Sequence, residues 1–161
     1  MENLYPLAQT VVTLLKQRGL RITFAESCTG GRLAALLTSV PGASDVFEGS
    51  CVAYANRIKS DWLHVSETTL ARYGAVSREC VEEMLAGIKA ISGAECAVAV
   101  SGIAGPGGGT PQKPVGTVYI GVTVPGKSEV FHCLFKGDRQ SVQNASVRFA
   151  YEKMAEFLKK S

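Results

Sequence analysis

Histidine and paired cysteine are scarce in this sequence, and their scarcity excludes several kinds of catalytic site. The 161 residues include two histidines, His64 and His132, which leaves little material for a metal centre or a Ser-His-Asp triad. Five cysteines are widely spaced and form no C-x-x-C pair, which argues against a disulfide framework and against a zinc site. We therefore expect chemistry that requires no metal and no redox cofactor.

Long apolar runs and clusters of like charge are also absent. No apolar run approaches the ~20 residues that a membrane-spanning helix needs. The first residues do not form the basic segment and apolar core of a secretion signal. The net charge is +3 and the basic residues are scattered, which gives little support to nucleic-acid or membrane-surface binding. These absences predict a cytoplasmic protein that binds neither nucleic acid nor membranes.

The sequence does have the composition and pattern of a globular domain. Hydrophobic residues make up 46% of the chain and charged residues 19%, and the length suits one domain, 1–161, with an ample core. Apolar spacing and end signals predict helices over 4–18, 29–40, 56–63, 66–73, 77–92 and from 138 onward, and strands over 22–26, 46–54, 96–100, 117–124 and 128–135. The last two strands predict an antiparallel hairpin around Pro125-Gly126. The whole pattern predicts a three-layer α/β/α domain with a mixed sheet.

The stretch RITFAESCTGG, residues 21–31, joins a predicted strand to a predicted helix. Ser27, Cys28 and Thr29 lie on the turn, where free backbone N–H groups and a helix amino terminus suit an oxyanion or a phosphate. A hydroxyl on such a turn can also be a nucleophile, although the G-x-S-x-G pattern of the α/β-hydrolases is absent. The alternative is that Ser27 or Thr29 merely caps the helix, and the turn by itself favours the cap.

Cys28 differs from the other cysteines, which lie among apolar neighbours and are expected to be buried thiols. A thiolate at position 28 would be stabilised by the helix end, so a thiol nucleophile competes with Ser27 on this turn.

Residues 101–116 follow the apolar strand and hold six glycines and three prolines. Glycine-rich backbone after a buried strand lets a ligand approach closely, especially a phosphate. The segment is neither a Walker A loop nor a dinucleotide fingerprint, because a strand follows it instead of a helix. A flexible surface loop is the alternative. We favour a binding loop, since ligands bind at strand ends in α/β sheets.

The stretch YANRIK, residues 54–59, places Tyr54 at the end of a strand and Lys59 just after it. A lysine can act as base to a serine nucleophile when burial or a nearby cation lowers its pKa. Considered alone, Lys59 is more typical of a solvated surface lysine.

Taken together, these stretches resemble one protein family. AESCTGG at 25–31, YANRIK at 54–59, SGIAGPGGGTPQKPVGTVY at 101–119 and KGDR at 136–139 closely resemble the CinA carboxy-terminal domain family. Its single-domain members include the nicotinamide-mononucleotide amidohydrolases, while some members are known only as competence-damage-inducible proteins. Longer members carry an amino-terminal domain that resembles molybdopterin-binding proteins. This chain begins at the amidase-like part, which predicts the stand-alone form.

The resemblance implies that the substrate is nicotinamide mononucleotide and that the products are nicotinate mononucleotide and ammonia. In the family the serine of AESCTGG is the nucleophile and the lysine after Y-x-N is a general base, which correspond here to Ser27 and Lys59. The resemblance also implies a catalytic role for Tyr54 and substrate-binding roles for Cys28, Thr29, Gly30, Gly31, Asn56, Gly102, Gly105, Gly107, Gly108 and Arg139. Gly107 departs from the family pattern, because many relatives have aspartate after Gly-Pro.

Amide hydrolysis needs an activated nucleophile and a stabilised oxyanion, and backbone N–H groups near Thr29-Gly30 are expected to bind that oxyanion. Arg139 is expected to bind the phosphate, because a guanidinium matches it with two hydrogen bonds. The alternative for Arg139 is solvation beside Asp138.

Two rival hypotheses remain. One is a catalytically silent nucleotide-binding regulatory module, although the retention of both Ser27 and Lys59 favours the enzyme. The other is an amidase that uses the Cys28 thiol. We also expect a homodimer or a higher homo-oligomer, since apolar-rich α/β domains of this size often pair.

Overall fold

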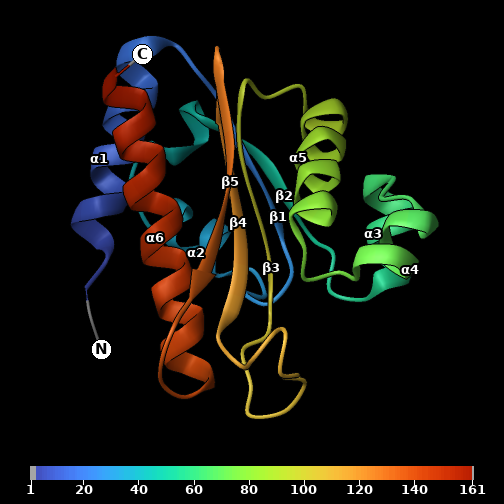
Figure 1. Cartoon of the computed structure of the whole chain (residues 1–161). Coiled ribbons are helices and arrows are strands. Elements are labelled where there is room, and N and C mark those ends of the chain that lie inside the picture. Colours follow the sequence, from blue (N-terminus) through green and yellow to red (C-terminus); the bar gives the residue numbers. More distant parts are fainter. Residues whose placement is uncertain (1–2, 161) are drawn as a thin grey trace.

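Five strands form a single mixed sheet in the order β2-β1-β3-β4-β5 (Figure 1). The structure is a computed structural model and describes residues 3–160. The strands are β1 (Ile22–Glu26), β2 (Phe47–Val52), β3 (Cys96–Gly102), β4 (Thr117–Val124) and β5 (Lys127–Leu134). The helices are α1 (Tyr5–Arg18), α2 (Arg32–Thr38), the short 3-10 helix η1 (Ala43–Asp45), α3 (Asn56–Leu63), α4 (Glu67–Tyr73), α5 (Arg78–Ser92) and α6 (Arg139–Lys160).

Helices cover both faces of the sheet, as the three-layer prediction required. Figure 1 shows α1, α2 and α6 on one face and α5, with α3 and α4 beyond it, on the other. The apolar residues of α5, Val81, Met84, Leu85 and Ile88, recur at helical spacing and are all buried against the sheet. On the opposite face Phe24 packs against Tyr151 of α6, with ring centroids 6.1 Å apart. Within the described residues no helix is both long enough and apolar enough to cross a membrane.

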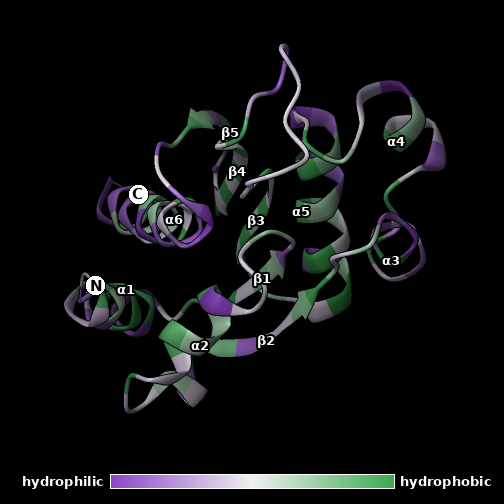
Figure 2. Cartoon of the chain, turned by 90° about the horizontal axis from the view of Figure 1, so that it is seen from below, coloured by the Kyte–Doolittle hydropathy of each residue, from purple (hydrophilic) through white to green (hydrophobic). Residues whose placement is uncertain are grey.

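The strand register brings the four sequence motifs to one edge of the sheet. β1 is parallel to both of its neighbours, and Glu26 at its end pairs with Val52 of β2 and Val100 of β3. The residues that follow these three strands therefore emerge side by side. β4 starts next to the end of β3, and β5 ends next to the start of β4, so the 103–116 loop and the start of α6 reach the same edge. Figure 2 views the molecule from this edge, with the apolar strands between the two helical layers.

Several element boundaries differ from the predictions. The helix expected over 29–40 is shorter, because Gly30 and Gly31 have φ angles of 57° and 99° that continue the turn to Arg32. The second strand ends at Val52, so Tyr54 lies in the connection to α3. Along α6, Phe149 is only half-buried, because a neighbouring set that includes Ser146 and Tyr151 forms the buried side of the helix.

Candidate active site

A cavity of about 200 Å³ opens at the edge of the sheet where the motifs meet. Its lining comes from five segments: Ser27 and Cys28; Tyr54, Asn56 and Lys59; Ala75 and Val76; Ser101, Gly102 and Ala104; and Arg139. Four of these segments are the sequence motifs. The fifth, at 75–76 before α5, carries no polar side chain that could have marked it in the sequence.

Lys59 and Ser27 are in direct contact inside this cavity. The Lys59 side chain is 1% exposed, and its Nζ lies 3.0 Å from Ser27 Oγ and 2.8 Å from the backbone oxygen of Tyr54. Burial lowers the pKa of Lys59 below its ordinary value, because the charged form loses its hydration. The interpretation of Lys59 as a solvated surface lysine is therefore wrong.

Close packing of α3 against α5 explains why Lys59 is buried. Lys59 and Leu63 form the buried side of α3. Where α3 ends, the backbone oxygen of Leu63 approaches Gly87 of α5 so closely that a Cβ at position 87 would lie 2.0 Å from it. Because Gly87 has no side chain, α3 and α5 can pack closely together. This close packing buries Lys59 of α3.

The turn between β1 and α2 is built around the carboxylate of Glu26. The Thr29 hydroxyl donates to Glu26 Oε1 at 2.7 Å, so Thr29 is a donor to the carboxylate and does not cap the helix. Three backbone N–H groups at the start of α2, those of Gly31, Leu33 and Ala34, also donate to this carboxylate. The expectation of a free helix end is therefore wrong, and so is the expectation that Ser27 or Thr29 caps it.

Two N–H groups on this turn nevertheless stay available. Gly30 N–H donates to the Ser27 oxygen at 3.0 Å and is already used. Within residues 3–160, the N–H groups of Cys28 and Thr29 have no hydrogen-bond partner. The backbone oxygen of Cys28 accepts a 3.1 Å hydrogen bond from Gln143 Nε2 of α6. This bond holds the peptide group between Cys28 and Thr29 in place. Of these two residues Cys28 lines the cavity and the fully buried Thr29 does not, so any oxyanion binding on this turn falls to the Cys28 N–H, not to Gly30.

The thiol of Cys28 is unsuited to be the nucleophile. The residue is 4% exposed, and burial raises the pKa of the thiol to about 11. At neutral pH the thiolate is rare, which contradicts the expectation that the turn would stabilise it. Of the other cysteines, Cys80, Cys96 and Cys133 are buried as predicted, while Cys51 is partly exposed.

Arg139 spans the mouth of the cavity. Its Nη1 donates to the backbone oxygen of Gly105 at 2.6 Å, and its Nη2 donates to the Tyr54 hydroxyl at 3.1 Å. Asp138 caps α6 separately, by accepting from the backbone and side chain of Ser141. Arg139 is therefore part of the cavity wall and not a solvated neighbour of the cap.

The glycine motifs contribute unequally to the cavity. Gly102 lines it, and Gly105 reaches it through the bond to Arg139. Gly107 and Gly108 lie farther along the loop and do not line it, and a Cβ at Gly107 would meet open space. Thr29, Gly30 and Gly31 shape the turn without lining the cavity.

Sequence reasoning missed three polar residues here. Glu26 and Gln143 hold the turn, and Ser101, which is 1% exposed, lines the cavity. Glu26 could have been noticed as a carboxylate directly before a predicted helix start, and Gln143 as an amide beside the apolar stripe of a helix.

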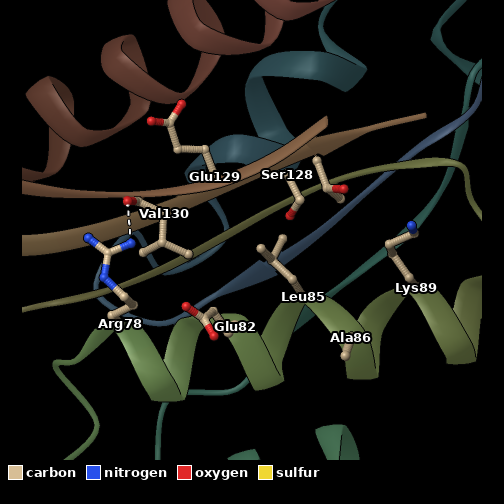
Figure 3. Close-up of a pocket in the computed structure, with 9 residues that line it drawn as sticks. Arg78, Glu82, Leu85, Ala86, Lys89, Ser128, Glu129 and Val130 are labelled. Carbon is tan, nitrogen blue, oxygen red and sulfur yellow. Dashed lines mark hydrogen bonds between the residues drawn. The ribbon is translucent and has the colours of Figure 1, made fainter. Parts of the chain in front are cut away.

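A larger hollow of about 550 Å³ lies between α5 and the β4–β5 hairpin (Figure 3). Arg78 donates to the Val130 oxygen at 2.8 Å there and ties α5 to β5. Charged side chains of both signs line this hollow. It also contains a serine, Ser128, but within the described residues no lysine donates to the Ser128 hydroxyl as Lys59 does to Ser27. Residues 3–160 also contain no cluster of three His, Cys, Asp or Glu side chains that could hold a metal. The cavity around Ser27 is therefore the candidate active site.

Known sequences resemble this chain over nearly its whole length. A model of the family called CinA C-terminal domain matches residues 4–158. A CinA-like protein from Thermotoga neapolitana is 49% identical over 153 residues, which are 95% of this chain and 37% of that protein. One from Syntrophotalea carbinolica is 43% identical over 94% of this chain and 37% of its own length. The chain thus spans little more than a third of these relatives.

Solved structures match the fold closely. A CinA superfamily protein from Klebsiella pneumoniae superposes with a TM-score of 0.95 at 39% identity and covers 99% of this chain and 100% of its own. A competence/damage inducible protein from Agrobacterium tumefaciens gives 0.93 at 38% identity, with 99% and 97% coverage.

Proposed function

This chain belongs to the family of CinA C-terminal domains, and from that premise we propose that it hydrolyses the carboxamide of nicotinamide mononucleotide. The products are nicotinate mononucleotide and ammonia. One observation carries the proposal: a buried lysine whose pKa is lowered by burial lies 3.0 Å from a serine hydroxyl inside a cavity. A nucleophile in hydrogen-bond contact with a base is the pairing that acyl transfer requires.

Lys59 is the base in this proposal. In its neutral form it accepts the Ser27 proton while Oγ attacks the carboxamide carbon, and its remaining N–H still donates to the Tyr54 oxygen. Collapse of the tetrahedral adduct breaks the carbon–nitrogen bond, and Lys59 passes the proton to the leaving nitrogen, which departs as ammonia. Water then attacks the acyl ester, with Lys59 again as base, and restores the Ser27 hydroxyl.

The turn supplies the oxyanion site. The Cys28 N–H follows the nucleophile directly, which is the position that donates to the oxyanion in nucleophile elbows. The unpaired N–H group of Cys28, which lines the cavity, is the donor that we assign to it. Loss of one such donor typically costs about 2.7–4 kcal/mol in the barrier.

The phosphate end of the substrate fits the cavity mouth. Arg139 supplies a planar guanidinium there, and a guanidinium binds a phosphate through two parallel hydrogen bonds. Both partners of Arg139, Tyr54 and Gly105, are neutral, so no carboxylate competes with the phosphate for these donors.

The test is ammonia release from nicotinamide mononucleotide by the parent protein, by Ser27→Ala and by Ser128→Ala. Ser128 lines the separate hollow of Figure 3 and gives a matched serine-to-alanine control. We expect release by the parent and the control and none by Ser27→Ala. Release by all three would move the chemistry off Ser27. Binding of the mononucleotide without release by any of them would favour a silent regulatory module.

A further inference from the structure

Glu26 precedes the proposed nucleophile, Ser27, in the sequence, and its carboxylate is buried. Its side chain is 0% exposed. Oε1 accepts hydrogen bonds from the Thr29 hydroxyl at 2.7 Å, from Gly31 N–H at 3.2 Å and from Leu33 N–H at 2.9 Å. Oε2 accepts from Ala34 N–H at 3.1 Å. No lysine or arginine forms a salt bridge with it in the part of the chain described, so donors from one local segment stabilise its charge.

The backbone around Glu26 is held as firmly as its side chain. Its oxygen accepts from Ala53 N–H of the segment after β2 at 2.8 Å, and Ser27 N–H donates to Val100 of β3 at 3.0 Å. Bonds to β3 and to the segment after β2 thus hold the start of the turn, at Glu26 and Ser27. The Glu26 carboxylate holds the end of the turn, at 29–34, through its own hydrogen bonds.

From these contacts we propose that Glu26 is a positioning residue, which keeps the N–H group of Cys28 open to the oxyanion. This inference rests on the proposed function. On an ordinary turn before a helix, a threonine side chain caps the helix by accepting from its first N–H groups. Here Glu26 takes those N–H groups, and the Thr29 hydroxyl becomes a donor to Glu26. Without the carboxylate, the Thr29 oxygen is free to become the cap, and the turn rearranges.

A second consequence concerns the helix charge. An anion already lies on the start of α2, so the positive end of that helix is neutralised before any substrate enters. Stabilisation of the oxyanion then depends on the geometry of the Cys28 N–H group and not on the helix as a whole. A small rotation of the turn therefore lowers the rate without weakening the binding of the rest of the substrate.

The test compares Glu26→Gln with Glu83→Gln. Glu83 of α5 is a matched control, because it also accepts from a backbone N–H, that of Ser66, and from a threonine hydroxyl, that of Thr69, and it does not line the cavity. For Glu26→Gln we expect kcat to fall about tenfold to a hundredfold with KM changed less than about threefold. For Glu83→Gln we expect unchanged kcat and a comparable loss of thermal stability. A folded Glu26→Gln protein with kcat within about threefold of the parent overturns the proposal.

A second pair of variants keeps the test valid if Glu26→Gln does not fold. Thr29→Val removes one of the four donors and keeps the carboxylate, and Thr29→Ser restores a hydroxyl. We expect kcat to fall about fivefold to twentyfold in the valine variant and to recover at least in part in the serine variant. Equal rates in the two variants would overturn the proposal.

Labelling of Ser27 by a fluorophosphonate, followed by mass spectrometry, separates this inference from the choice of substrate. The phosphonyl oxygen needs the same N–H donor as the amide oxyanion. If the parent is labelled but releases no ammonia, the proposed substrate is wrong. Slower labelling of Glu26→Gln than of Glu83→Gln would still support the positioning role. Equal labelling rates overturn it, and absence of Ser27 labelling in the parent overturns both proposals.

Discussion

Arg139 at the start of α6 donates a 3.1 Å hydrogen bond to the hydroxyl of Tyr54, which follows β2 at the other side of the cavity. A second N–H of the same guanidinium donates to Gly105 in the 103–116 loop. One side chain therefore joins three segments that are far apart in the sequence. Because both partners are neutral, they orient the guanidinium at the cavity mouth, and within residues 3–160 no carboxylate forms an ion pair with it.

Arg139→Ala is expected to raise KM for nicotinamide mononucleotide about tenfold to a hundredfold and to change kcat little, since a hydrogen bond to a charged group is worth about 1.5–3 kcal/mol. The control substrate is nicotinamide riboside, which lacks the phosphate. Steady-state kinetics should show that the variant loses the preference of the parent for the mononucleotide over the riboside. An equal loss with both substrates would contradict a role in phosphate binding.

Lys59→Arg is expected to lower kcat by about 10²–10⁴-fold with a modest change in KM, because an arginine keeps its proton and cannot act as a base. Lys113→Arg is the matched control. Its ammonium also donates to a backbone oxygen, that of Tyr73, but lies outside the cavity. Equal losses in kcat and in binding would argue that Lys59 serves in binding and not in proton transfer.

The buried lysine should also make stability depend on pH. Its pKa is lowered in the folded protein, so between that value and the ordinary value of about 10.4 the unfolded chain binds more protons, and stability rises with pH. Below the pKa of Lys59 in the folded protein, the lysine is charged in both states, and the free energy of unfolding is reduced by the full cost of burying that charge. We expect Lys59→Met to unfold a few degrees above the parent at pH 7 and the gap to close toward pH 10. Exposed Lys136→Met should show no such trend in the same melting curves.

Cys28→Ala is expected to lower kcat less than about fivefold, far less than Ser27→Ala, because the alanine keeps the backbone N–H and loses only a protonated thiol. With a pKa of about 11, Cys28 should also resist iodoacetamide at neutral pH, while the partly exposed Cys51 reacts first. Peptide mass spectrometry after brief labelling resolves the order. Loss of activity in step with labelling of Cys28 would revive the thiol mechanism.

Gly87→Ala should destabilise the protein by about 1–3 kcal/mol and lower kcat, although alanine favours a helix by up to ~1 kcal/mol over glycine. The new Cβ would lie 2.0 Å from the Leu63 oxygen, so α3 must move and Lys59 moves with it. Ala86→Gly on the exposed side of α5 is the comparison, with about 1 kcal/mol lost through helix propensity and kcat retained. Denaturant melts and initial rates measure both effects.

Much of the fold could be predicted from local signals. Residues 56–63 form the predicted helix, Gly93 ends α5 in a left-handed conformation, and the hairpin turns at Pro125-Gly126. These features depend on few residues with strong conformational preferences. The start of the helix after the first motif was misplaced, because Gly30 and Gly31 have positive φ angles and Gly31 N–H donates to the Glu26 side chain, and neither feature is visible in the sequence.

The candidate site was predictable only as a set of segments. Parallel strands bring the residues after them to one edge, which sequence pattern alone suggests. The burial of Lys59 could not be predicted, because its helix also carries exposed polar residues and is held by a glycine of another helix. Glu26 and Gln143 were missed for a related reason. Their partners are backbone atoms, whose positions the sequence does not display.

The β4–β5 hairpin has a practical consequence for work with this protein. Val124 and Lys127 flank its exposed turn, and the opposite ends of the same strands, Thr117 and Leu134, lie at the edge with the cavity. Eight-residue strands place the turn roughly 23 Å from that edge. An affinity tag or a fluorescent reporter inserted between Pro125 and Gly126 would leave the cavity mouth open, so the protein can be attached to a sensor surface there with the cavity facing the solution.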